Sequence, residues 1–344
     1  MKLLSGVSSL SDLCASIDAG VDEVYCGVLT KEWLAEYSNI ASINRVDRLN
    51  GNLRSYDELS AIIKYAHNRG VKVNLALNSL YTQAQEELLN KEIGIILCTG
   101  IDAIIVADLG LISIIKEKKF SGQIHAGSGL TVFNSQTAGF LGELGVSRIV
   151  LPRDLTIDEI RDIVEDNPDM QFEVFIMNGR CRNSDGFCTF QHGISDLINP
   201  GVNKFLINSS LGHKLQELLA GLPRFFRGRV MDVFGSSVCA TACSLNYKIK
   251  PKASALLRLN NDFVSDIFSC GGCYVRDFLS CGVSALKIVG RSFPLERKIK
   301  DIRYLRSLIN TAANGGISAA GFFDHARNSY KEIFGSPCGK NCYY

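Results

Sequence analysis

Residues 100–127, GIDAIIVADLGLISIIKEKKFSGQIHAG, contain the pattern that decides the fold. A short apolar run at 103–107 is followed by a helical pattern at 109–118, and a second strand-like run follows at 123–126. In the middle part, apolar residues recur every three or four positions, as they do on one face of a helix. The stretch therefore predicts a strand, a helix and a second parallel strand, which together make a βαβ unit.

The same alternation extends in both directions along the chain. Strands are expected at 2–5, 23–27, 71–77, 103–107, 123–126, 148–151, 172–177 and 284–289, and helices at 8–19, 56–68, 83–97, 109–118, 135–144, 157–165 and 295–313. Ser9 or Ser11 is predicted to cap the first helix, and Thr156 with Glu159 forms the pattern of a capping box. Eight such units predict the α/β class and a (β/α)₈ TIM-like barrel.

A doubly wound open sheet is the alternative to the barrel. No Gly-x-Gly-x-x-Gly follows an early strand, and no glycine-rich loop ends in Gly-Lys-Ser/Thr. The absence of these nucleotide-binding motifs favours the barrel.

The rhythm of strands and helices breaks between the seventh and eighth strands. Residues 1–180 are expected to hold the first seven βα units, 181–282 a cysteine-rich insertion, 283–313 the last unit and 314–344 a C-terminal tail with a Cys-x₃-Cys motif. An insertion after a barrel strand lies over the C-terminal ends of the strands, where barrel active sites are built. The cysteines are therefore expected to lie near the site.

Composition narrows the class of protein. Of 344 residues, 46% are hydrophobic and 21% charged, which excludes a disordered chain. The net charge of +2 does not support a strongly basic nucleic-acid-binding domain. No apolar run reaches the ~20 residues of a membrane-spanning helix, and the first residues do not resemble a signal peptide. We expect a cytoplasmic protein without a membrane partner.

Cysteine is the most informative residue type. Nine of the 12 cysteines follow residue 180: Cys181, Cys188, Cys239, Cys243, Cys270, Cys273, Cys281, Cys338 and Cys342. In a reducing compartment such clusters indicate metal or redox chemistry more often than disulfides, and thiolates suit zinc or iron–sulfur clusters. The spacing predicts a metal site without selecting the metal, and reduced structural thiols are the alternative. For Cys338 and Cys342, a second metal, a redox pair and a tail without a site all remain open.

Five segments in order resemble the peptidase U32 family of iron–sulfur barrel proteins. They are DEVYCG at 22–27, GIDAIIVAD at 100–108, LPRDL at 151–155, EVFIMNGRC at 173–181 and LKIVGR at 286–291. The resemblance covers about residues 1–310. The chain departs from the family pattern at Asn178, where histidine is common, and in a long segment of 50 residues between Cys188 and Cys239.

The resemblance implies four cluster ligands. Cys181 and Cys188 match the family's Cys-x₆-Cys pair, Cys239 matches its third ligand and Cys270 its fourth. Together they are expected to hold one [4Fe–4S] cluster. Cys243 and Cys273 are the alternatives, because each lies only a few residues from a chosen ligand.

The resemblance also implies a choice of activities. The leading hypothesis is oxygen-independent hydroxylation of an RNA base, a small ring compound or a peptide. The alternatives are a collagenase-like peptidase and a non-catalytic, cluster-carrying partner of a paralogous U32 protein. A cluster held by four thiolates transfers electrons but offers no evident water-activating metal, and the sequence has no Ser-His-Asp or His-Glu-x-x-His signature. Redox modification is therefore favoured over hydrolysis.

Four residues near strand ends are the catalytic candidates: His125, Arg153, Glu173 and Arg291. The two guanidinium groups match carboxylates and phosphates, but each also suits a structural ion pair with a residue such as Glu173 or Asp154. His125 is either a proton donor or a histidine held by hydrogen bonds. Glu173 is expected to line the floor of the site or to pack as a polar core residue.

Three further features have two interpretations each. Asp108 either orients substrate or caps a helix. Asn178 lines the floor of the site or packs in the core. Residues 222–229, LPRFFRGR, combine arginine and phenylalanine as single-stranded RNA binders do, or form an insertion helix with solvated arginines.

Overall fold

The computed structural model describes residues 1–36, 43–44, 51–179, 185–186, 269–338 and 342–344. In this part of the chain, eight parallel strands form a closed barrel in sequence order. They are β1 (Lys2–Gly6), β2 (Glu23–Cys26), β3 (Lys72–Leu77), β4 (Ala103–Val106), β5 (Gln123–Ala126), β6 (Arg148–Val150), β7 (Gln171–Met177) and β8 (Ala285–Ile288). The predicted (β/α)₈ barrel is confirmed, and every strand end agrees with its prediction to within one residue.

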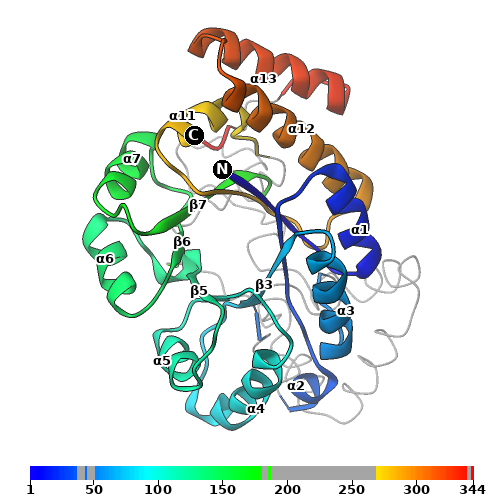
Figure 1. Cartoon of the computed structure of the whole chain (residues 1–344), viewed down its shortest axis with the longest axis vertical. Coiled ribbons are helices and arrows are strands. Elements are labelled where there is room, and N and C mark those ends of the chain that lie inside the picture. The colour runs from blue at the N-terminus through cyan, green and yellow to red at the C-terminus, as the bar shows by residue number, and fades with distance from the viewer. Residues whose placement is uncertain (37–42, 45–50, 180–184, 187–268, 339–341) are drawn as a thin grey trace, which may run out of the picture.

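Helices surround the barrel (Figure 1). The predicted ones are α1 (Leu10–Ala19), α3 (Tyr56–His67), α4 (Glu86–Leu97), α5 (Leu109–Glu117), α6 (Ser135–Glu143), α7 (Ile157–Glu165) and α12 (Leu295–Asn314). The Ser9 side chain accepts from the Asp12 N–H, and Thr156 and Glu159 form the predicted capping box. The Asp108 carboxylate accepts from the first N–H groups of α5, which confirms its capping role.

In the described ranges, three helices were not predicted: α2 (Lys31–Glu36), α11 (Val275–Ser280) and α13 (Ala319–Phe334). The short 3₁₀ turn η6 (Gly272–Tyr274) precedes α11 directly. Because α11 stands between β7 and β8, it is the helix of the seventh βα unit. Most of the predicted insertion, residues 181–184 and 187–268, lies outside the described residues.

The segment before α11 extends the wall of the barrel beyond β7. The Asn178 N–H donates to the Ser269 carbonyl at 2.8 Å, and the Gly271 N–H donates to the Ile176 carbonyl at 2.8 Å. Cys270 therefore lies directly beside the end of β7, at the end of the barrel where the strands finish. We call this end the mouth.

The C-terminal segment, predicted to be a tail, also belongs to the fold. Helix α13 packs on α12, where the rings of Tyr304 and Tyr330 meet edge to face at 5.5 Å. The last residues then return to the barrel beside α11 (Figure 1). There the backbones of Cys342 and Cys270 form a parallel β-bridge, and the rings of Tyr344 and Phe278 of α11 lie 4.9 Å apart. Among the described residues, no helix has the length and apolar character to cross a membrane.

Candidate functional site

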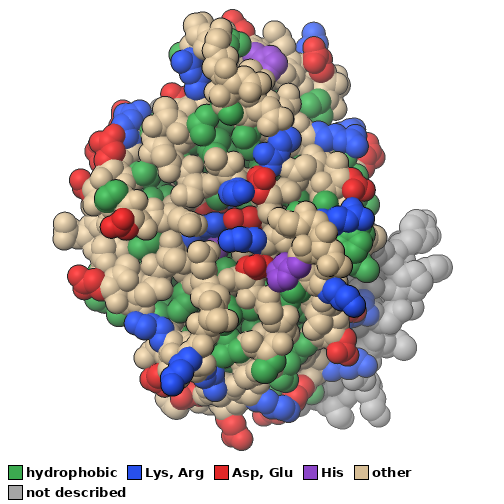
Figure 2. All heavy atoms as spheres, viewed as in Figure 1, with side chains coloured by type: hydrophobic (Ala, Val, Ile, Leu, Met, Phe, Trp, Pro, Cys, Tyr) green, Lys and Arg blue, Asp and Glu red, His purple; other side chains and the backbone are tan. Residues whose placement is uncertain are grey.

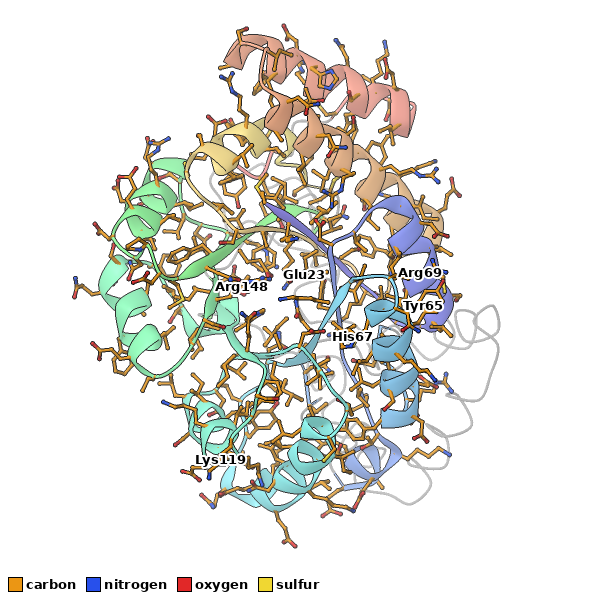
Figure 3. The ribbon with its side chains drawn as sticks, in the orientation of Figure 1. Glu23, Tyr65, His67, Arg69, Lys119 and Arg148 are labelled. Carbon is orange, nitrogen blue, oxygen red and sulfur yellow. The ribbon has the colours of Figure 1, made fainter. Side chains whose placement is uncertain are left out.

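A network of charged side chains fills the interior of the barrel below the mouth. Glu23 and Arg148, the first residues of β2 and β6, face one another inside the ring of strands (Figure 3). The Arg148 guanidinium donates to both Glu23 oxygens at 2.6 and 2.9 Å and to Glu173 at 3.4 Å. Glu173 in turn accepts from the Lys287 ammonium at 2.6 Å. Two carboxylates thus meet two cations, and the network is neutral.

Pairing decides the charge state of this network. Burial disfavours a charged Glu23, but the hydrogen bonds and the positive charge of Arg148 outweigh burial and hold the pKa of Glu23 at about 2. Burial lowers the pKa of Lys287, and the opposing effect of Glu173 is smaller. On the face shown in Figure 2, the side chains of Lys and Arg (blue) alternate with those of Asp and Glu (red) near the centre. The predicted candidate Glu173 therefore lies in this structural network, under the mouth.

His125 also lies inside the barrel. Its side chain is 1% exposed, and its Nε2 is 3.2 Å from the Gln123 oxygen, which lies towards the start of β5. No described residue bonds its Nδ1. Burial and the charge of Arg148 lower its pKa to about 3, so the ring is neutral at physiological pH. The structure places the predicted proton donor within the packed interior.

At the mouth, Arg291 lies over the ends of β1, β2 and β8. It follows β8 by three residues and is 3% exposed. Its Nη2 donates to the Asn44 side-chain oxygen at 2.8 Å and its Nη1 to that of Asn52 at 3.3 Å. Its Nε is buried with no hydrogen-bond partner. Burial lowers the pKa of Arg291, and no carboxylate of the described residues forms an ion pair with it.

Arg153 occupies the opposite side of the mouth, after β6. Its guanidinium pairs with Asp185 at 2.6 Å and stacks on the Phe175 ring, 3.6 Å from the ring centre. The hydroxyl of Tyr343, which is 1% exposed, accepts from Arg153 Nε at 3.4 Å and donates to the Asn178 carbonyl. An ion pair was one of the two predicted roles of Arg153, although with Asp185 rather than with Glu173 or Asp154.

Tyr25 connects the charged interior to the mouth. Its ring lies 4.4 Å from Lys287 Nζ and 5.8 Å from the Arg291 guanidinium carbon. Its hydroxyl donates to the Ile288 carbonyl at 3.3 Å. The mouth, with Lys287 just below it, therefore combines three cations with aromatic rings, which suits a planar or anionic ligand.

Cys270 stands at the edge of this mouth. Its sulfur accepts from the Gly272 N–H at 3.3 Å and lies 3.8 Å from the Tyr304 hydroxyl. A backbone N–H aimed at a sulfur is an outer contact of the kind that tunes metal–sulfur sites, so the contact from Gly272 fits Cys270 as a cluster ligand. Burial raises the pKa of the free thiol to about 11. Cys181, Cys188 and Cys239 lie outside the described residues.

The C-terminal cysteines approach the same place. Burial, together with the smaller effects of the thiols of Cys270, Cys338 and Cys342, raises the pKa of Cys273 to about 12. Within the described ranges, no three Cys, His, Asp or Glu side chains are arranged to hold a metal ion.

Asn178 and residues 222–229 are the remaining predicted features. Asn178 is buried and donates to Asp301 at 2.6 Å, which is the predicted core-packing role. Residues 222–229 lie outside the described residues.

Sequence reasoning missed Tyr25, Arg148, Lys287 and Tyr343. Arg148 has partners 125 and 25 positions away, and Tyr343 has partners 165 and 190 positions away, so no local pattern marked them. Tyr25 and Lys287 stood inside the segments that resembled the family, and only their position in an apolar strand set them apart.

A protein-family model that matches more than half of the chain identifies the family. The model of the family described as Peptidase family U32 matches residues 8–200. The chain belongs to this family. Among U32 and related proteins, an uncharacterized protease of Methanocaldococcus jannaschii is 31% identical over 192 residues, which cover 55% of this chain and 43% of that protein.

Two relatives in Escherichia coli have names that refer to RNA modification. The tRNA hydroxylation protein P is 27% identical over 187 residues, covering 54% of this chain and 38% of that protein. The 23S rRNA 5-hydroxycytidine C2501 synthase is 29% identical over 254 residues, covering 74% of this chain and 32% of that protein. This U32 chain therefore spans less than half the length of each of these curated relatives.

Proposed function

We propose that this protein holds a [4Fe–4S] cluster at the mouth of the barrel and takes part in oxygen-independent hydroxylation of an RNA base. The proposed ligands are Cys181, Cys188, Cys239 and Cys270. A cluster of this type supplies electron transfer when it is bound. The names of the two relatives from Escherichia coli support the choice of RNA over a small ring compound or a peptide.

The observation that carries the proposal is the position of Cys270. The Asn178 N–H bonds to Ser269, so the segment that leads to Cys181 starts beside the segment that contains Cys270. Cys270 thus lies beside Asn178, three positions before the proposed ligand Cys181 in the sequence, at the end of the barrel where the strands finish. This is the end where βα barrels perform their chemistry.

The residues of the mouth have distinct roles in this proposal. Arg291 binds and orients an anionic group of the substrate, since a guanidinium matches phosphate and carboxylate geometry, whereas Arg153, paired with Asp185, adds a surface stacked on Phe175. The buried Tyr25 ring supports a planar group from below and helps to exclude water. Lys287 donates to Glu173 at 2.6 Å, and its ammonium nitrogen lies 4.4 Å from the centre of the Tyr25 ring.

A collagenase-like peptidase is the second candidate, and the protease relative with 31% identity favours it. Of the histidines in the described ranges, His125 is buried in the barrel, His67 pairs with Asp102 and His325 is on α13. None of these three lies at the mouth, where a general base for hydrolysis is needed. Redox modification therefore remains the preferred function.

The test is the content of hydroxylated nucleosides in tRNA and rRNA of a deletion strain, measured by mass spectrometry. We expect one hydroxylated pyrimidine to disappear in the deletion strain and to return with the wild-type gene. The Cys270→Ser gene is expected to fail to restore it, whereas Cys14→Ser, a change remote from the mouth, is expected to succeed.

Two further assays, peptide cleavage and co-purification, separate the alternative functions. An unchanged nucleoside profile, together with cleavage of an unstructured peptide by the anaerobically purified protein, would contradict the proposal and favour the peptidase. Co-purification with a second cysteine-rich barrel protein, with loss of activity when either is absent, would favour the role of a cluster-carrying partner.

A further inference from the structure

The positive charge of Arg291 has no negative partner in the described part of the chain. Of the three cations at and just below the mouth, Arg153 pairs with Asp185 and Lys287 pairs with Glu173. The acceptors of Arg291 are the amide oxygens of Asn44 and Asn52, which orient the guanidinium without neutralising it. A buried charge without a counter-charge is costly for a protein to maintain, and it is retained where a ligand supplies the opposite charge.

The hydrogen-bonding capacity of Arg291 is also only partly used. A guanidinium carries five N–H donors, and the two bonds to Asn44 and Asn52 use two of them. The Nε is buried without an acceptor. Because the side chain is 3% exposed, bulk water does not compensate for this unmade bond. The open donors match the paired oxygens of a carboxylate or a phosphate.

The surrounding backbone is shaped to admit the guanidinium. A Cβ atom at Gly27 would lie 2.1 Å from Arg291 Nη1, and a Cβ at Gly6 would lie 2.6 Å from its Cγ. Any larger residue at either position would displace the side chain. Asn44 also donates to Asn52 at 2.9 Å, which fixes both amides that hold the guanidinium. The cation is therefore held in place by two glycines and two asparagines from separate segments.

We infer that Arg291, held by Asn44 and Asn52 over the Tyr25 ring, is an oxyanion-binding subsite that takes a carboxylate or phosphate group of the ligand. Arg291 anchors one negatively charged group, whereas Arg153, already neutralised by Asp185, contributes mainly the stacked surface with Phe175. The subsite is independent of the reaction proposed above, because it requires only that a ligand of the mouth carries an oxyanion.

The test is calorimetric titration of the anaerobically purified full chain at low ionic strength. The probes are inorganic phosphate, uridine 5′-monophosphate and benzoate, which separate a phosphate ligand from a carboxylate ligand. We expect saturable binding of at least one probe with a Kd below about 10 mM. Arg291→Gln is expected to weaken that binding about tenfold or more.

Two further variants separate specific recognition from loss of charge or of folding. Gly27→Ala keeps every charge but displaces the guanidinium, and is expected to weaken binding by a similar factor. Arg306→Gln removes one positive charge from a partly buried arginine that pairs with Asp22, and is expected to change binding by less than about twofold. The melting temperature of Arg291→Gln without ligand is expected to equal or exceed that of the wild type, because the variant removes an uncompensated buried charge.

Three results would overturn the inference. They are wild-type protein that binds none of the probes, an Arg291→Gln variant that binds like the wild type, and a Gly27→Ala variant that binds like the wild type. A failure of the nucleoside experiment with retained anion binding would reject the proposed reaction and leave the subsite standing.

Discussion

The lower interior of the barrel and its mouth both contain buried charged side chains. Those of the lower interior are all paired with opposite charges, whereas one at the mouth has no such pair within the described residues. Below the mouth, Arg148 and Lys287 meet Glu23 and Glu173, and the set is neutral. At the mouth, Arg291 has amide partners and no carboxylate in the described residues. The paired charges stabilise the fold, because each ion pair compensates for the burial of its members. The unpaired charge of Arg291 is the one that we propose binds a ligand, because a negatively charged ligand would supply the missing counter-charge.

The largest expected effect on stability comes from a substitution that breaks the neutral network below the mouth. Arg148→Gln leaves Glu23 and Glu173 without their shared partner, and is expected to lower the free energy of unfolding by about 3–5 kcal/mol. Arg161→Gln, which breaks an exposed pair with Asp158, is expected to leave the free energy of unfolding almost unchanged. Denaturant unfolding measures both variants, and a cost below about 1 kcal/mol for Arg148→Gln would contradict the structural role of the network.

The next effect concerns the pH dependence of stability. The pKa of His125 is about 3 in the folded protein and 6.5 in the unfolded chain, so between these values only the unfolded chain gains the proton. Stability from this group is therefore complete above pH 6.5 and decreases by about 1.4 kcal/mol per unit as the pH falls. His125→Gln is expected to remove this slope between pH 6.5 and 4.5, as measured by urea unfolding.

Other groups do not disturb this comparison. Burial raises the pKa of Asp301 to about 6, which produces a slope of opposite sign between 3.8 and 6, equally in both proteins. Glu23, with a pKa of about 2 against 4.5, affects stability only as the pH falls below 4.5. Parallel pH profiles for the wild type and His125→Gln would show that His125 is accessible to protons in the folded protein.

The smallest effect separates two neighbouring tyrosines of the C-terminal segment. Tyr343→Phe and Tyr344→Phe each remove a hydroxyl that donates to a backbone carbonyl, at a cost of about 1 kcal/mol. Only the Tyr343 hydroxyl also contacts Arg153. A double-mutant cycle with Arg153→Ala is expected to give a coupling of at least ~0.5 kcal/mol for Tyr343 and less than ~0.3 kcal/mol for Tyr344. Equal couplings would show that Tyr343 does not position Arg153.

The sequence predicted the barrel well because the strands are short, mostly apolar segments that are buried on both faces and alternate with helices with one apolar side. Helix α13 was missed although Phe322, Ala326 and Tyr330 follow each other at intervals of four and are buried. That spacing was a usable signal. The cap at Asp108 was foreseen as one of two roles, because capping depends on nearby residues.

The pairing of the site residues was not predictable from the sequence. Arg153 and Arg291 had the same two candidate roles, and only the fold gave a carboxylate to the first and amides to the second. The return of Cys342 to Cys270 depends on how α13 folds back on α12, which no local pattern encodes. Spacing selects residues that can perform chemistry, whereas the three-dimensional arrangement decides which of them are already neutralised.

The claim that the mouth is the functional half of the barrel is tested most directly by its metal content. Iron and acid-labile sulfide are determined under anaerobic conditions, with EPR spectra of the reduced protein, for the wild type, Cys270→Ser and Cys273→Ser. We predict about four iron and four sulfide per chain in the wild type and in Cys273→Ser, with loss of both in Cys270→Ser. A wild-type protein without iron and sulfide, or a Cys270→Ser variant that retains them, would contradict this account.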